Sequence, residues 1–236
     1  MGNALTLAWR ELRLYFSSWM AYAVAAGFLA ISGLIFWIIL SDTQEAQLRW
    51  TIENIVVIFL FITPLITMRL LAEEKRSGTL ELLMTSPVTD AQVVLGKFLG
   101  ALGLLVVLLV PTLVFPGVLA RYGDPDWGPI LSGYLGLFLA GACFVAVGVL
   151  ASSVTESQVV AGFLAFGMLL TLWIVGWAAG PGSTGAKEAI AYMSVLRHFA
   201  DFPKGLIQTK DVVYYLTFVA FCLFAAMRSL ESRKWR

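Results

Sequence analysis

The chain has 236 residues, of which 59% are hydrophobic and 13% are charged, with a formal net charge of +1. Soluble domains carry about 25% charged residues, so a mean hydropathy of +0.85 indicates that lipid is the solvent of most of the surface. The balanced charge gives no reason to expect a nucleic-acid partner, and two cysteines inside apolar runs supply neither a disulfide framework nor a metal site.

The first 18 residues are predicted to form an amphipathic helix on the inner surface of the membrane. Four apolar residues recur at helical spacing, while two arginines fall elsewhere on the helical wheel. The apolar residues are Leu5, Trp9, Leu12 and Phe16, and the arginines are Arg10 and Arg13. A frayed polar terminus is the alternative that these residues leave open.

Six apolar stretches approach the roughly 20 residues that a helix needs to cross the hydrocarbon. They cover about 19–40, 55–71, 98–120, 130–151, 159–180 and 212–230. Backbone polar groups in lipid must bond internally, which makes such runs helices, and the alternating ten-residue pattern of a membrane barrel is absent from the sequence. We therefore expect an all-α integral membrane protein with six transmembrane helices in a single domain, 1–236.

The distribution of Lys and Arg at the span ends predicts the orientation. The richer side carries Arg10, Arg13, Arg69, Lys75, Arg76, Lys97, Arg228, Arg233, Lys234 and Arg236. The poorer side carries Arg49, Arg121, Lys187, Arg197, Lys204 and Lys210. The richer side should face the cytoplasm, which places both termini inside the cell at the inner (plasma) membrane.

The inner segment 72–96 contains signals for a short helix between two spans. Four consecutive charged residues, Glu73 to Arg76, follow the second span, and Ser77-Gly78 should end the helix there. A new amphipathic helix should follow from Thr79 and end before Pro87, and Thr89 with Gln92 forms a capping-box pattern for the third span. A rigid surface helix of this kind could be a handle for a cytoplasmic motor. A solvated loop resting on lipid is equally compatible with these residues.

Two stretches resemble a known family. The run Glu73-Glu-Lys-Arg-Ser-Gly-Thr-Leu-Glu-Leu-Leu-Met-Thr-Ser-Pro-Val-Thr, followed by Gly96-Lys-Phe, is similar to the cytoplasmic signature of ABC type 2 transporter permeases. It resembles in particular the Gld-type and Nos-type branch, named for gliding motility and copper processing. The end of the chain, from Arg197-His-Phe through Asp211-Val-Val-Tyr-Tyr to Arg228-Ser-Leu-Glu-Ser-Arg, resembles the end of the same subfamily.

The resemblance implies a six-span permease that pairs with a second, identical or related, permease subunit above two ABC ATPase subunits. Export and a prokaryotic source follow from it as expectations, with ATP and Mg bound by the ATPase and no cofactor bound by this chain. The residues expected in or beside the coupling helix that contacts the ATPase are Glu73, Glu74, Lys75, Arg76, Gly78, Thr79 and Glu81. Arg10 and Arg13 should lie near the same contact.

The outer segment 181–211 is expected to form two short amphipathic helices that dip into the outer membrane surface. Apolar residues recur at helical spacing and are interrupted at Pro203-Lys-Gly205. By resemblance this segment shapes the outer end of the pathway, with Phe199, Phe202 and Leu206 as gate candidates. An interfacial loop without a part in transport is the alternative. The single histidine, His198, is read as an interfacial residue, since one histidine makes no metal site.

Several functions lack the residues that they need. No span carries an acid, lysine or histidine at its centre, which argues against a proton-coupled transporter and against a charged ion filter. Gly96-Lys97 is followed by Phe98, so no phosphate-binding loop exists and the ATPase must be another chain. A membrane enzyme would need a polar constellation that is missing. The alternative to a permease is the membrane subunit of an ATP-driven mechanical or regulatory complex that acts on an outer-side partner without translocating cargo.

Overall fold

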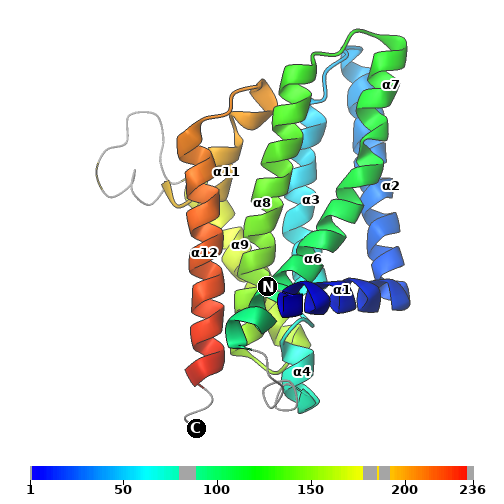
Figure 1. Cartoon of the computed structure of the whole chain (residues 1–236). Coiled ribbons are helices and arrows are strands. Elements are labelled where there is room, and N and C mark those ends of the chain that lie inside the picture. Colours follow the sequence, from blue (N-terminus) through cyan, green and yellow to red (C-terminus); the bar gives the residue numbers. More distant parts are fainter. Residues whose placement is uncertain (1, 80–88, 178–184, 186–191, 233–236) are drawn as a thin grey trace.

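The computed structural model describes residues 2–79, 89–177, 185 and 192–232. Within these residues the elements are all helical. Long helices run side by side as a bundle, and α1 (Gly2–Ser17) lies across the bundle near its lower end in Figure 1. The all-α class predicted from the sequence is therefore found in the described part of the chain.

Five described segments are long and apolar enough to cross a membrane. They contain α2 (Trp19–Thr43), α3 (Arg49–Thr67) with α4 (Ala72–Arg76), α6 (Asp90–Thr112) with α7 (Val114–Tyr122), α8 (Trp127–Val154) and α12 (Thr209–Glu231). The remaining apolar helix, α9 (Gln158–Ile174), has 17 residues and continues as a 3-10 turn, η1 (Val175–Trp177). At about 1.5 Å per residue, α9 lies at the short end of what can span the hydrocarbon. A sixth span thus stays a prediction.

The first outer connection is shorter than predicted. The apolar run placed the start of the second span near residue 55, whereas α3 begins at Arg49. The side chain of Leu48 is buried against the core, and Arg49 forms an ion pair with Glu53 at 3.0 Å, one helical turn further on. A polar first turn of this kind can be helical outside the hydrocarbon, so hydropathy alone underestimates the length of the helix.

The third predicted span consists of two consecutive helices. Pro111 lies in the last turn of α6, Leu113 separates the helices, and Pro116 lies in the first turn of α7. A proline removes one helical hydrogen bond and is tolerated best near a helix start. The span therefore breaks between the two helices, and α7 continues it at a different slope in Figure 1.

Helix α8 forms the centre of the bundle. In its most apolar 18-residue window 83% of residues are buried, against 11% for α2. Its glycines permit the close approach of neighbours: a Cβ at Gly148 would lie 2.0 Å from Thr67 Oγ1, and one at Gly141 would lie 2.5 Å from Leu105 Cδ1. Small residues at helix contacts are the usual solution in membranes, where the hydrophobic effect does not drive helices together.

The outer connection before α12 contains α11 (Val195–Phe199) and the 3-10 turn η2 (Phe202–Lys204). Gly205 ends η2 with φ of +87°, a conformation that glycine adopts without strain. The predicted break at 203–205 is therefore found. Whether these short helices enter the membrane stays a prediction, and 181–184 and 186–191 of the predicted segment lie outside the described residues.

Candidate functional site

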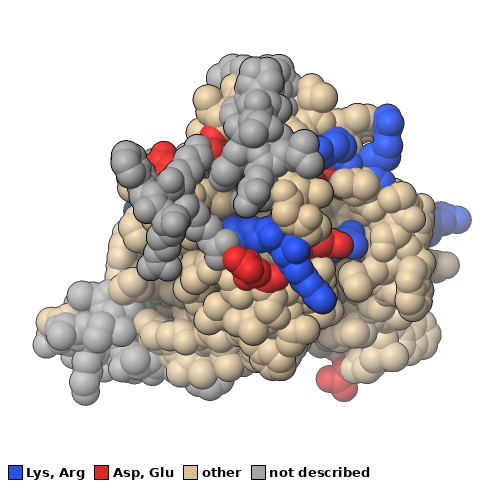
Figure 2. Space-filling view, turned by 90° about the horizontal axis from the view of Figure 1, so that it is seen from below, with Lys and Arg blue, Asp and Glu red and all other residues tan. Residues whose placement is uncertain are grey.

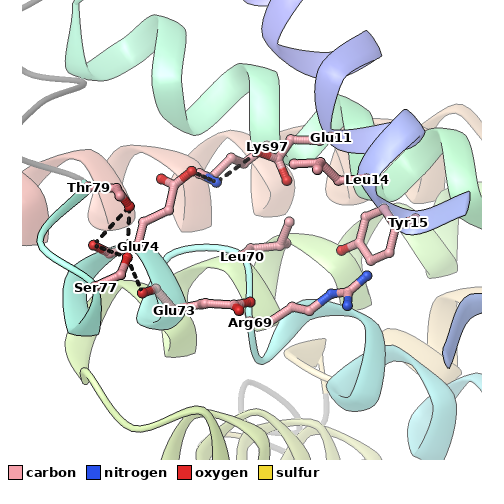
Figure 3. Close-up of a pocket in the computed structure, with 10 residues that line it drawn as sticks. All are labelled: Glu11, Leu14, Tyr15, Arg69, Leu70, Glu73, Glu74, Ser77, Thr79 and Lys97. Atoms are coloured by element: carbon pink, nitrogen blue, oxygen red, sulfur yellow. Dashed lines mark hydrogen bonds and ion pairs between the residues drawn. The ribbon is translucent and has the colours of Figure 1, made fainter. Parts of the chain in front are cut away.

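A polar cavity of about 330 Å³ lies at the lower end of the bundle, where α1, α4 and α6 meet (Figure 3). Its walls come from three regions far apart in the sequence. The lining residues are Glu11, Leu14, Tyr15, Arg69, Leu70, Glu73, Glu74, Ser77, Thr79 and Lys97. Figure 2, seen from this end, shows acidic and basic side chains gathered near the middle of the face, with further basic side chains toward one side of it.

The most buried charge in this cavity is Lys97, on α6. Its side chain is 3% exposed, and its Nζ lies 2.8 Å from Glu74 Oε1 and 3.0 Å from Glu11 Oε1. Arg10 Nη2 approaches the same two carboxylates at 3.3 Å and 3.4 Å. We call these four residues, Arg10, Glu11, Glu74 and Lys97, the Lys97 cluster. Two acids and two bases make it formally neutral, which is the condition for burying charges at tolerable cost.

Helix α1 reaches Lys97 because two glycines on α6 leave room for it. A Cβ at Gly96 would lie 2.7 Å from Leu7 Cβ, and a Cβ at Gly100 would lie 2.6 Å from Glu11 Cβ. A Gly-x-x-x-Gly pattern such as Gly96 and Gly100 allows close helix packing but does not identify the partner helix. The structure identifies the partner as α1, which presses its backbone against α6 on either side of Lys97.

Helix α4 is fixed to the end of α8 by hydrogen bonds to two serines. No side chain caps α4 from its own N-cap residue, Leu71. Instead, Ser152 Oγ accepts hydrogen bonds from the backbone N–H groups of Leu71 and Ala72, each at 3.0 Å. Lys75 Nζ donates to the carbonyl of Ser153. Since the first N–H groups of a helix lack internal partners, Ser152 satisfies groups that would otherwise be buried unpaired.

The rim of the cavity is built on Tyr15 and Arg69. The Tyr15 hydroxyl donates to the carbonyl of Ile66 at 2.8 Å, and the Arg69 guanidinium lies 4.6 Å above the Tyr15 ring. Burial raises the pKa of Tyr15 above its ordinary value, and the nearby Arg69 charge opposes this shift only partly. The phenol therefore stays neutral and holds the end of α1 against the end of α3.

The predicted contact residues separate into inward and outward groups. Glu74 and Lys75 point toward the chain's own helices, whereas Glu73, Arg76, Gly78 and Thr79 are exposed. Gly78 has φ of +70° and follows Ser77, the C-cap residue of α4, which confirms the predicted helix break. Glu81 and the amphipathic helix expected after Thr79 lie outside the described residues. Arg13 is exposed on α1, on the same end of the bundle.

The capping box predicted for the third span is confirmed. The Thr89 hydroxyl accepts from the backbone N–H of Gln92 at 3.3 Å, and the Gln92 side-chain oxygen accepts from the backbone N–H of Thr89 at 3.2 Å. These bonds fix the start of α6 and therefore the position of Lys97 two turns later.

Two of the three gate candidates are core residues in this structure. Phe199 and Phe202 are 2% and 0% exposed and pack at Gly136 of α8, while Leu206 is 54% exposed. The carbonyl of Phe202 also accepts a hydrogen bond from Ser132 Oγ at 2.7 Å. These contacts hold η2 against α8, and a gating role for the three residues stays a prediction.

A buried contact between His198 and Asp211 was missed by reasoning from the sequence. His198 was expected to be an interfacial residue, but its side chain is 4% exposed, with Nδ1 2.6 Å from Asp211 Oδ1. Its Nε2 lies 3.0 Å from the carbonyl oxygen of Tyr192, and its ring stacks on Tyr214. The pair joins α11 to the first turn of α12. A helix-start aspartate following the single histidine was the available signal, and it is too common to be specific.

Comparison of the sequence with known proteins identifies the family of the chain. Residues 22–227 match the family described as ABC-2 family transporter protein. The chain belongs to this family. This ABC-2 protein is thus a multi-pass transmembrane ABC transporter permease, as the resemblance of its inner segment implied. The finer resemblance to the Gld-type and Nos-type branch stays a prediction.

Two relatives of this ABC-2 permease come from one species. The chain is 28% identical over 150 residues to a probable multidrug ABC transporter permease, YbhR, of Escherichia coli strain K12. It matches the protein of the same name from Escherichia coli O157:H7 to the same extent. The aligned part covers 62% of this chain and 40% of each relative, so the chain spans less than half the length of the curated relatives it matches.

Proposed function

We propose that this chain is the membrane subunit of an ATP-driven exporter, in which a separate ABC ATPase hydrolyses ATP and drives a substrate across the membrane. The observation that carries the proposal is the family match over residues 22–227. The sequence lacks a Gly-x-x-x-x-Gly-Lys-Ser/Thr loop to cradle nucleotide phosphates. ATP and Mg therefore belong to the ATPase subunit, and this chain supplies the pathway and the contact surface.

The ATPase is proposed to dock at the end of the bundle that carries α4. Glu73 and Arg76 are exposed there, next to the positive-φ Gly78 that ends the helix. The start of α1 and the end of α12 lie at this same end (Figure 1). Together with the excess of Lys and Arg, this favours a cytoplasmic location for both termini.

The assembly is proposed to contain two permease chains, identical or related, and two ATPase subunits. An amphiphilic substrate is favoured because the charged residues of the described spans lie toward the helix ends. The relatives' name, a probable multidrug permease, points the same way. A pathway of this kind gives little to bind a strongly charged solute.

The proposal is tested by purifying the tagged full chain from its native membrane in mild detergent, identifying every partner and assaying ATPase activity. We expect an ATPase subunit to co-purify. Glu73→Lys should weaken that association, because Glu73 is exposed and no ion pair holds it among the described residues. Glu45→Lys, the same change at the opposite end, should leave it intact. Purification without any ATPase, after controls for complex stability, would reject the function.

The orientation has its own test. Cysteines introduced at Ser77 and at Glu45, both exposed, lie at opposite ends of the bundle. In intact cells an impermeant thiol reagent should reach the Glu45→Cys site and leave the Ser77→Cys site unlabelled until the membrane is opened. Labelling of Ser77→Cys in intact cells would overturn the inside placement of α4.

A further inference from the structure

The Lys97 cluster connects three elements that share few other charged contacts. One ammonium group on α6 is bonded to a carboxylate of α1 and to a carboxylate of α4, at 3.0 Å and 2.8 Å. We propose that Lys97 is a positioning residue that locks α1, α4 and α6 into one unit, so that force applied by the ATPase to α4 reaches α6. The lock is a property of the chain alone, whereas the transmission rests on the proposed function.

The Lys97 cluster is expected to fix the relative positions of the helices more than it stabilises the fold. Removing charges from water is costly, and apolar residues of the same volume often stabilise a protein as well or better. Within the described residues, the buried Glu74 Oε2 accepts no hydrogen bond. What an ion pair provides, and an apolar contact does not, is one preferred position for each partner.

The Lys97 cluster also makes it unfavourable for α4 or α1 to move relative to α6 on its own. The Lys97 ammonium donates a hydrogen bond to Glu11 of α1 and forms an ion pair with Glu74 of α4, so carboxylates on two different helices share it. If α4 moved away from α6 alone, the buried Lys97 ammonium would lose one of its two carboxylate partners. The close contact at Gly96 and Gly100 equally prevents α1 from sliding along α6. Displacement of α4 should therefore carry α1 and α6 with it.

The first arm of the test measures the lock in the full chain, reconstituted in lipid nanodiscs without an ATPase. Spin labels at Arg13→Cys on α1 and Arg76→Cys on α4, both exposed, report the distance between the two helices. The buried Cys143 and Cys222 are replaced by alanine in the background. The variants are Lys97→Met, Lys97→Arg and the triple variant Lys97→Met, Glu11→Gln, Glu74→Gln. Lys210→Met, an exposed lysine at the other end, is the matched control.

We expect the distance distribution to broaden in Lys97→Met and in the triple variant, and to stay narrow in Lys210→Met. In Lys97→Arg the distance distribution should stay nearly as narrow as in the unsubstituted chain, because the positive charge is kept. The triple variant has no unpaired buried charge, so it should fold even if Lys97→Met does not. A triple variant that folds with the same narrow distribution as the unsubstituted chain would overturn the lock, because the ion pairs would then be dispensable for position.

The second arm uses the complex with its co-purified ATPase. A cysteine at Tyr122, which is 88% exposed at the far end of α7, is labelled with and without ATP and vanadate. We expect the trapped state to change the labelling rate, and the triple variant to lose this change while the ATPase stays bound. A change retained in the triple variant, or none in the unsubstituted complex, would overturn transmission through Lys97. If no ATPase co-purifies, the proposed function fails, and the first arm still decides the lock.

Discussion

The close packing of α1 on α6 allows a quantitative prediction for Gly100→Ala. The new Cβ would lie 2.6 Å from Glu11 Cβ and 3.2 Å from the carbonyl oxygen of Ala8. Carbon atoms pack at about 3.5–4.0 Å, so α1 would have to move outward by roughly 1 Å. Overpacking of this kind costs about 1–3 kcal/mol. Since Glu11 is the residue displaced, its 3.0 Å contact with Lys97 should lengthen as well.

The matched control is Gly27→Ala on α2, where no heavy atom lies within 4 Å of the new Cβ. Both changes gain about 0.5–1 kcal/mol of helix preference, and this gain cancels in the comparison. Unfolding of the two variants in mixed micelles, followed by circular dichroism, should show Gly100→Ala to be less stable by about 1–3 kcal/mol. Equal stability would refute the α1–α6 contact as drawn.

Three further predictions use the same unfolding assay. His198→Ala leaves the buried Asp211 side chain without its hydrogen-bonding partner and should cost about 1–3 kcal/mol. Replacing Asp211 by alanine as well should recover part of the loss, and strict additivity would contradict the pairing. Ser152→Ala removes the acceptor of two backbone N–H groups and should cost about 1–3 kcal/mol, whereas exposed Ser41→Ala should change little; similar losses would contradict the role given to Ser152. For Tyr15, burial raises the folded-state pKa above the unfolded value of about 10, so its contribution is fully present below about pH 10 and is lost as pH rises through the folded pKa. Tyr15→Phe should flatten the alkaline fall in stability, and an equally steep fall in the variant would exclude Tyr15 as its source.

The spans and the helix signals near them could be predicted from the sequence because both depend on neighbouring residues. Crossing the hydrocarbon requires one continuous apolar run, so five of the predicted spans are found without knowledge of any contact. Thr89 with Gln92 and the Gly78 break are likewise found where they were predicted, since capping and positive φ are local effects. The start of α3 was misplaced, because hydropathy does not register a polar first turn held by Arg49 and Glu53.

The charged pairs were decided by tertiary structure. Glu11 and Lys97 are 86 positions apart, and no local pattern in either helix selects the other as its partner. The Gly96 and Gly100 pair permitted a close neighbour, but several apolar helices could have filled that role. A buried charge takes whatever opposite charge the packing brings within reach. The sequence alone therefore determined that this protein crosses the membrane and roughly where five of its spans lie, because both depend on continuous apolar runs. Only the packing of α1 and α4 on α6 determined which charges meet.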